Sequence, residues 1–246
     1  MPDKEREVKI QEALCIHHDK VKEKYSVVMT VLCGSQNYRL DTESSDYDTY
    51  TFVLPNFIDI AMLKDPVSTM IEDEYGHINI KDIRLALNLL KKTSPNSVEW
   101  FASKYRIIEP EYTDLFDTYI TPETLRCSTK HMMAAIGGLA HQLTKRNMSP
   151  GKRYSHLLRM ECMVDNYYNL QSDILSLTEV ERNKALRAKM LQNTPFYDGK
   201  CFECEQRIKE KIESYSNVNM SKIEELGMSN VNELQVKLFK VLISKY

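Results

Sequence analysis

The feature that most constrains the fold is a short apolar run, residues 27–33, that ends at Gly34 and Ser35. The run is far too short to cross a bilayer, and its composition is typical of a strand buried on both faces. Glycine permits a sharp backbone turn or the close approach of a ligand. The sequence therefore predicts a buried strand over residues 26–35 that ends in a Gly-Ser turn.

A second predicted strand, residues 47–54, follows directly on Asp46 and includes Asp48. Successive strand side chains point to opposite faces, so Asp46 and Asp48 project together while Tyr47 points away. Two carboxylates this close repel each other. A pair of Mg²⁺ or Mn²⁺ ions would relieve that repulsion, bridge phosphates and stabilise the reacting oxygens of a nucleotidyl transfer. Asp46 and Asp48 are therefore the candidate metal ligands.

Ten residues lie between Ser35 and Asp46, enough for a short helix and a loop. At Gly34 the backbone can approach phosphates, while Ser35, the turn amides and the positive end of the following helix can bind them. The alternative is an ordinary turn beside an acidic strand edge, and either element alone favours that interpretation. Their joint order and spacing favour a site for a nucleoside triphosphate.

The remaining pattern predicts a helix over residues 8–24, a strand over 76–81 and a helix to about residue 92 that Asp82 caps. Strand signals largely end after Tyr112. We expect an α/β (α+β) fold, with a small mixed sheet and flanking helices followed by a helical C-terminal region. The expected domains are residues 1–115 and 116–246. Helices are predicted over residues 122–146, 152–171, 178–192, 202–215 and 230–245.

The composition limits the class of protein. A chain of 246 residues with 42% hydrophobic residues can bury a substantial core, and a net charge of −2 argues against coating nucleic acid by bulk positive charge. The charged N-terminus lacks the apolar run of a signal peptide, so we expect a cytoplasmic protein without a membrane span. Cys201 and Cys204 have the spacing of half a zinc site, but no second close pair completes it.

Gly34-Ser35 together with Asp46-x-Asp48 resembles the signature of the DNA polymerase β-like nucleotidyltransferase superfamily. The longer stretch is similar to the nucleotidyltransferases of the RlaP-like family, and the similarity touches residues 26–104 and 130–192. Downstream positions that carry the resemblance are Asp82-Ile83-Arg84, Ala86-Leu87, Ser94-Pro95-Asn96, Glu99-Trp100, Lys152, His156 and Arg159.

The resemblance implies a metal-dependent enzyme that transfers a nucleoside monophosphate from a nucleoside triphosphate to RNA, protein or a small molecule. It also implies that Lys152, His156 and Arg159 bind the triphosphate or the acceptor. These three residues share one helix face at i, i+4 and i+7, a pattern that by itself favours a solvated basic face above an apolar packing face. Ser45, beside the acidic pair, is a further nucleotide-binding candidate.

Two positions depart from the family pattern. His77 stands where the family commonly has a third carboxylate, so either neutral His77 ligates a metal or Asp82 replaces that group, although Asp82 is equally explained as a helix cap. Arg39 stands where glycine is common and is a candidate phosphate contact. The candidate catalytic set is thus Asp46, Asp48, Asp82 and His77.

Two other functions are compatible with the sequence. The first is a relative that binds nucleotide or nucleic acid but has lost catalysis, and the second is an antitoxin-like protein whose C-terminal helices bind another chain. We expect Glu99 to be a structural partner rather than a general base and Trp100 to lie in the core. The sequence does not define an oligomeric state.

Overall fold

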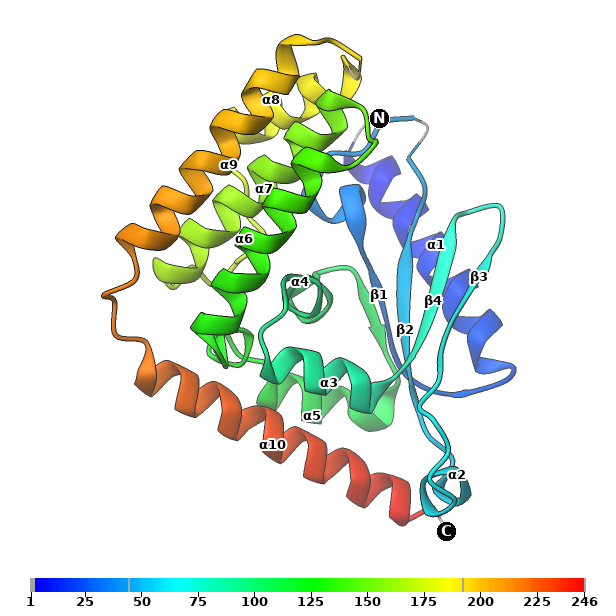
Figure 1. Cartoon of the computed structure of the whole chain (residues 1–246). Helices are drawn as coiled ribbons and strands as arrows, with labels where there is room; N and C mark the ends of the chain where they lie inside the picture. The colour runs from blue at the N-terminus through cyan, green and yellow to red at the C-terminus, as the bar shows by residue number, and fades with distance from the viewer. Residues whose placement is uncertain (1–2, 44, 192, 246) are drawn as a thin grey trace.

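The computed structural model describes residues 3–43, 45–191 and 193–245, and it has the predicted α/β class, with a mixed sheet and a helical C-terminal region (Figure 1). The sheet has five strands in the order β3-β4-β2-β1-β5. Their bounds are β1 (Ser26–Leu32), β2 (Thr49–Leu54), β3 (Ser68–Glu72), β4 (His77–Asp82) and β5 (Arg106–Ile108).

Strand direction gathers distant parts of the sequence at one edge of the sheet. β1 is antiparallel to β2 and β5, whereas β2 is parallel to β4. Thr49, which opens β2, lies opposite Leu32 at the end of β1 and opposite Ile78 near the start of β4. The turn after β1, the segment before β2 and the first residue of β4 therefore meet at this edge.

Helices cover both faces of the sheet (Figure 1). On one face lies α1 (Asp3–Lys22), whose Ile10 and Leu14 pack with Leu32 of β1. On the other face the core continues through Phe52, Phe101 and Phe116, whose neighbouring ring centroids are 5.7 and 6.4 Å apart. The helices here are α3 (Ile83–Lys91), α4 (Pro95–Ala102) and α5 (Thr113–Tyr119), while the short α2 (Phe57–Ala61) lies between β2 and β3.

The C-terminal half is helical, and α7 is its central helix because α6, α8 and α9 all pack against α7. The last helix returns to pack against α3 and α5 of the N-terminal half (Figure 1). One hydrophobic core spans both halves, and the division into domains at residue 115 stays a prediction. The helices are α6 (Thr129–Lys145), α7 (Pro150–Tyr168), α8 (Glu179–Met190), α9 (Phe196–Ser214) and α10 (Ser221–Ile243).

Several boundaries differ from the sequence prediction. β1 ends at Leu32 rather than at residue 35, because the chain turns into a 3-10 segment, η1 (Gly34–Tyr38). β2 begins at Thr49, two residues later than expected. The sequence prediction does not include α4, whose start Ser94 caps and whose first turn contains Pro95. Strand β3 was missed because its residues are mostly exposed and show no alternation.

Among the helices of the described residues, none is long and apolar enough to span a membrane.

Candidate active site

A cavity of about 340 Å³ lies where the edge of the sheet faces α7 and α8. We call it the catalytic cavity. Gly34, Ser35, Ser45, Asp46 and Asp48 line it from the sheet side. The helices contribute Lys152, Ser155, His156 and Arg159 from α7 and Lys189 from α8. The structure thus brings most of the predicted site residues to one space, with carboxylates on one wall and cations on the other.

Gly34 has a φ of 75°, a conformation that strains other residues, and its N–H donates to Glu99 Oε1 at 2.8 Å. A Cβ at this position would lie 3.7 Å from Asp48 Oδ2. The predicted short helix is a 3-10 segment of five residues, η1, so it supplies little helix dipole. The hydroxyl of Ser35 has no hydrogen-bond partner within the described residues and is available to a ligand.

Asp46 and Asp48 keep the alternation expected of a strand although they precede β2. The ladder continues through Cys33 N–H donating to Asp48 O at 2.9 Å, and Tyr47 N–H donates to Tyr75 O at 2.8 Å. Tyr47 packs with the α1 cluster on the far side of the sheet. Asp46 is exposed and the Asp48 side chain is 44% exposed, so both carboxylates are accessible to a cation.

His77, the first residue of β4, lies beside the acidic pair. Its Nδ1 is 2.9 Å from Asp48 Oδ1, and this hydrogen bond raises the pKa of the imidazole, with the charges of Asp48, Glu72 and Asp46 acting in the same direction. A third polar group therefore lies beside the acidic pair, and it directly contacts one of the candidate metal ligands.

The donor set fits a divalent cation only in part. No cluster of three or more His, Cys, Asp or Glu side chains in residues 3–43, 45–191 and 193–245 is arranged as a complete metal site. Mg²⁺, however, is commonly held by one or two carboxylates and completed by water and substrate phosphate oxygens. Asp46 and Asp48 are accessible, hard oxygen donors that fit this incomplete kind of site.

The opposite wall of the catalytic cavity is cationic. Arg159 Nη2 is 3.4 Å from Glu99 Oε2, and its guanidinium lies 3.8 Å from the centre of the Tyr38 ring. Glu99 thus holds both Gly34 and Arg159, as a structural partner would, and Trp100 is buried in the core. Lys152 is exposed one turn of α7 before His156 and is free to reach an anion.

Lys189 was not predicted from the sequence. Its Nζ donates to Leu40 O at 2.9 Å and to Ser45 Oγ at 3.0 Å, so α8 holds the loop that leads to Asp46. Ser45 also accepts from Thr42 N–H at 2.8 Å, which makes it a loop-ordering residue in this structure. Only the placement of α8 against residues 40–45 brings this lysine to the site, and no local pattern indicates it.

Three predicted residues do not line the catalytic cavity: His77 contacts Asp48 from beside it, whereas Asp82 and Arg39 lie elsewhere. Asp82 is buried at the other end of β4, where it caps α3 through Arg84 N–H at 2.8 Å and pairs with Arg84 Nη2 at 2.7 Å. The register places Asp82 opposite Val53, at the end of β2 away from Asp48. Arg39 has a φ of 55° and lines a separate cavity of about 220 Å³. The structure therefore leaves His77 as the group beside the acidic pair.

Gly34→Val is expected to weaken nucleotide binding more than Ser35→Ala does. Valine at a φ of 75° is strained and directs its methyl groups toward Asp48, whereas Ser35→Ala removes one hydroxyl and leaves the turn intact. We expect a loss of roughly tenfold for Ser35→Ala, the value of one charge-assisted hydrogen bond, and a larger loss for Gly34→Val. Calorimetric titration of folded variants ranks them, and the reverse order contradicts the proposed turn.

His156 gives an expected pH effect on stability. Burial, together with the neighbouring Arg159, Lys152 and Lys189 charges, lowers its pKa from 6.5 to about 3. Between these values the unfolded chain binds a proton that the folded chain does not, so the free energy of unfolding falls as pH decreases. His156→Gln should reduce that fall relative to wild type in urea unfolding at several pH values. The exposed His131→Gln is the control, and equal pH profiles for all three proteins contradict the assignment.

Comparison with known proteins assigns the family. The model of the RlaP family, described as the RNA repair pathway DNA polymerase beta family, matches residues 7–237. No curated protein matches the chain. A solved structure similar to it is a nucleotidyltransferase-like protein from Exiguobacterium sibiricum 255-15, at 12% identity over 83% of this chain and 75% of that chain, with a TM-score of 0.32. A likeness this distant adds nothing to the assignment of the site. Because the family model covers nearly the whole sequence, the chain belongs to the RNA repair pathway DNA polymerase beta family.

Proposed function

We propose that this protein is a divalent-metal-dependent nucleotidyltransferase that transfers a nucleoside monophosphate from a nucleoside triphosphate to a hydroxyl acceptor. The observation that carries the proposal is the catalytic cavity itself, in which Asp46 and Asp48 face Lys152, His156 and Arg159. A polyphosphate with bound cations matches both walls, because the acids bind cations and the basic groups bind phosphate oxygens.

Asp46 and Asp48 would hold Mg²⁺ or Mn²⁺. The ion, when bound, polarises the phosphate under attack and offsets charge on the leaving pyrophosphate. The chain itself positions the triphosphate: Ser35 offers its hydroxyl, and Lys152 and Arg159 offer cationic donors across the cavity. Neutral His156 offers a hydrogen bond rather than a charge, because its pKa is low.

A second cavity, of about 320 Å³, continues from the catalytic cavity and shares Gly34, Met148, His156 and Arg159 with it. Its other walls are largely apolar and come from α4, α6 and α7. Such a two-part space suits a nucleotide, with phosphates against the charged walls and the base against apolar side chains. We assign the second cavity to the base and ribose. Its additional lining residues include Pro95, Leu139, Leu143, Met160 and Met163.

The direct test is an incubation of the purified chain with each labelled nucleoside triphosphate, Mg²⁺ or Mn²⁺, and separate RNA, protein and small-molecule acceptor pools. Metal-dependent transfer of label to one pool, with release of pyrophosphate, is the expected result. Nucleotide binding without transfer under every condition would instead support the alternative that this protein binds nucleotide but has lost catalysis. His77, which replaces the expected carboxylate, is the reason to consider that alternative.

His77→Ala and His77→Asp are both expected to lower turnover. The imidazole contacts Asp48 at 2.9 Å, and its removal frees a carboxylate whose position that contact sets. A loss of about tenfold corresponds to one charge-assisted hydrogen bond. Turnover measured in Mg²⁺ and in Mn²⁺ checks the prediction. An Asp variant more active than wild type would show that the natural site is impaired, and unchanged turnover in both variants would remove His77 from the site.

A further inference from the structure

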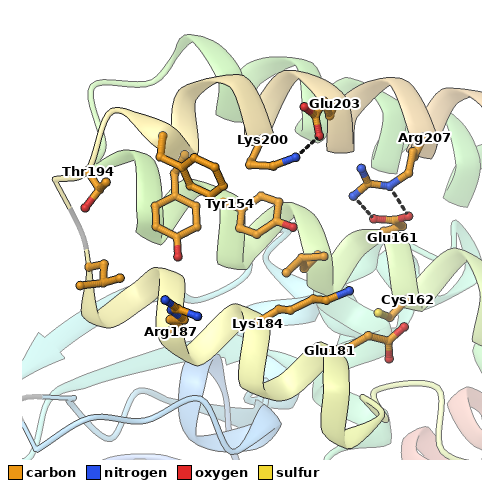
Figure 2. A pocket seen from close by; sticks show the side chains of 14 residues that line it. Tyr154, Glu161, Cys162, Glu181, Lys184, Arg187, Thr194, Lys200, Glu203 and Arg207 are labelled. Carbon is orange, nitrogen blue, oxygen red and sulfur yellow. Dashed lines mark hydrogen bonds and ion pairs between the residues drawn. The ribbon is translucent and has the colours of Figure 1, made fainter.

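A cavity of about 710 Å³, larger than the catalytic cavity and separate from it, lies between α8 and α9 over α7 (Figure 2). We call it the α8–α9 cavity. It forms because α8 and α9 both pack against α7 rather than against each other. The buried residues of α8 are only Ala185 and Ala188, so short side chains leave the space beside this helix unfilled.

The two cavities use opposite faces of the same helices. On α7, Tyr154 and Leu158 line the α8–α9 cavity, while Ser155 and Arg159 line the catalytic cavity. On α8, Lys184 and Arg187 line the α8–α9 cavity, whereas Lys189 lines the catalytic cavity. A helix with its side chains is about 10 Å across, so one ligand of nucleotide size cannot occupy both spaces through the helix.

Aromatic rings form one side of the α8–α9 cavity. Tyr154 and Tyr197 stack with ring centroids 5.5 Å apart, and Phe196 meets the Tyr197 ring edge-on at 5.4 Å. Phe196 is 64% exposed, so much of its ring is accessible to a ligand. The Tyr197 hydroxyl has no hydrogen-bond partner within the described residues, although the side chain is largely buried. Together these side chains offer a flat ring and a polar group to a ligand.

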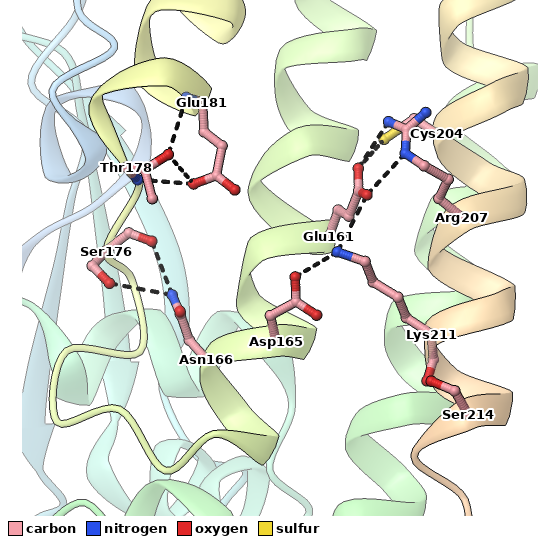
Figure 3. A network of polar contacts seen from close by, with 10 residues as sticks. All are labelled: Glu161, Asp165, Asn166, Ser176, Thr178, Glu181, Cys204, Arg207, Lys211 and Ser214. Atoms are coloured by element: carbon pink, nitrogen blue, oxygen red, sulfur yellow. Dashed lines mark hydrogen bonds and ion pairs between the residues drawn. The ribbon is translucent and has the colours of Figure 1, made fainter.

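The acidic groups of the α8–α9 cavity are already engaged. Arg207 binds Glu161 through two hydrogen bonds of 2.9 Å, and Lys211 lies 3.3 Å from the same carboxylate (Figure 3). Glu181 accepts from Thr178 N–H at 2.8 Å in a capping box (Figure 3). Glu203 pairs with Lys200 at 2.7 Å (Figure 2).

Two cations of the same cavity, in contrast, have no such partner. The side chains of Lys184 and Arg187 make no hydrogen bond or ion pair with any residue the structure describes (Figure 2). They lie one helical turn apart on α8, facing the space that the aromatic rings border. Four cations and three carboxylates line the cavity, so its net charge is positive, and two of the cations, Lys184 and Arg187, lie on one helix.

We propose that the α8–α9 cavity is a second, non-catalytic binding site for a nucleoside phosphate. Arg187 and Lys184 bind the phosphate, and the base packs on Phe196 and Tyr197, with the Tyr197 hydroxyl available to a polar edge of the base. The volume suits one small ligand rather than a helix or a folded partner. A simple anion would use only the cations. The exposed ring beside them favours a ligand that carries a base as well as a phosphate.

Occupation of this site acts on the helix that also serves the catalytic cavity. α8 buries little apolar surface against the rest of the protein, so ligand contacts with Lys184 and Arg187 stabilise this helix. The same helix carries Lys189, which holds Leu40 and Ser45. A bound nucleoside phosphate therefore orders the loop that leads to Asp46.

The test counts binding sites on the full chain by equilibrium dialysis with labelled ATP, GTP, CTP and UTP, each used separately. Wild type is expected to bind two equivalents of at least one of them. Lys184→Ala/Arg187→Ala should weaken one of the two sites by roughly tenfold or more and have a smaller effect on the other, which loses only the ordering of α8 by the ligand, and Phe196→Ala should weaken the same site. The charge-matched control is Lys222→Ala/Lys240→Ala, which removes two exposed lysines of α10.

The outcomes separate this site from the catalytic one. A second equivalent that survives Lys152→Ala but is lost in Lys184→Ala/Arg187→Ala supports the proposal even if the chain proves to have no transferase activity. Binding of a single equivalent that none of the cavity variants affects overturns it. A single-stranded hexanucleotide that binds through Lys184 and Arg187, when no free nucleotide does, also overturns it, because the cavity then receives a strand.

Discussion

Asp46→Asn and Asp48→Asn are each expected to abolish metal-dependent nucleotidyl transfer, with a loss of about a thousandfold or more. A bound divalent ion contributes several kcal/mol to transition-state stabilisation in such reactions, and each 1.4 kcal/mol corresponds to a factor of about ten in rate. An amide keeps the size of the side chain but removes the negative charge that holds the ion. Initial rates of label transfer at saturating Mg²⁺ measure the effect.

The fold should survive these changes, because neither carboxylate supports the core. Asp46 is exposed, and the Asp48 side chain is 44% exposed and bonds only to accessible His77 in this site. Asp19→Asn, on the exposed side of α1, is the matched control for loss of one negative charge. Wild-type turnover in either folded site variant would refute the metal centre. A loss of turnover in the control would point to charge effects unrelated to the site.

The acidic pair and the Gly-Ser turn were predictable because their geometry is local. A glycine at a strand end and two carboxylates two residues apart determine a turn and a shared side-chain direction without knowledge of the rest of the chain. The same local reasoning correctly predicted Asp82 as the cap of α3. It also predicted that Trp100, the only tryptophan of the chain, is buried.

The remaining site depends on contacts between segments far apart in the sequence, and these the sequence does not reveal. Lys189 reaches Leu40 across nearly 150 positions, and Glu99 reaches Gly34 only because α4 packs behind η1. Arg39 was expected at the phosphates, but its left-handed backbone turns the side chain toward another cavity. Side-chain direction after an irregular turn follows from the turn's own dihedral angles, which residue spacing does not encode.

Substitution of Arg126 is expected to have the largest effect on stability. Arg126 also contacts the end of α7, the helix that lines the catalytic cavity. Arg126 is fully buried and donates to four backbone carbonyls, at distances of 2.6 to 3.1 Å. Its guanidinium also lies 5.5 Å from the centre of the Tyr167 ring. The acceptors are the carbonyls of Pro122, Asn166, Tyr167 and Gln171. Arg126 therefore joins the segment before α6 to the C-terminal end of α7.

Arg126→Met is expected to lower the free energy of unfolding by about 3 kcal/mol or more. Methionine fills much of the volume but leaves several buried carbonyls without a donor, and each buried unsatisfied polar group costs about 1 to 3 kcal/mol. Arg126→Lys should lower the free energy of unfolding less than Arg126→Met does, because a donor remains. It should still be less stable than wild type, because an ammonium group cannot reproduce the planar fork that reaches several carbonyls at once. Urea unfolding followed by circular dichroism gives the values for both variants.

The same substitution should also affect nucleotide binding in the catalytic cavity, because α7 carries Lys152, His156 and Arg159 on the face toward Asp48. At a temperature where Arg126→Met is still folded, we expect weaker nucleotide binding than in wild type, since the end of α7 that Arg126 holds is free to shift. Lys130→Met, an exposed change on neighbouring α6, is the control for loss of one positive charge. Stability of the Arg126 variant within about 0.5 kcal/mol of wild type, the range of ordinary surface substitutions, would show that these carbonyls find other partners and that Arg126 does not hold the segment before α6 to the end of α7.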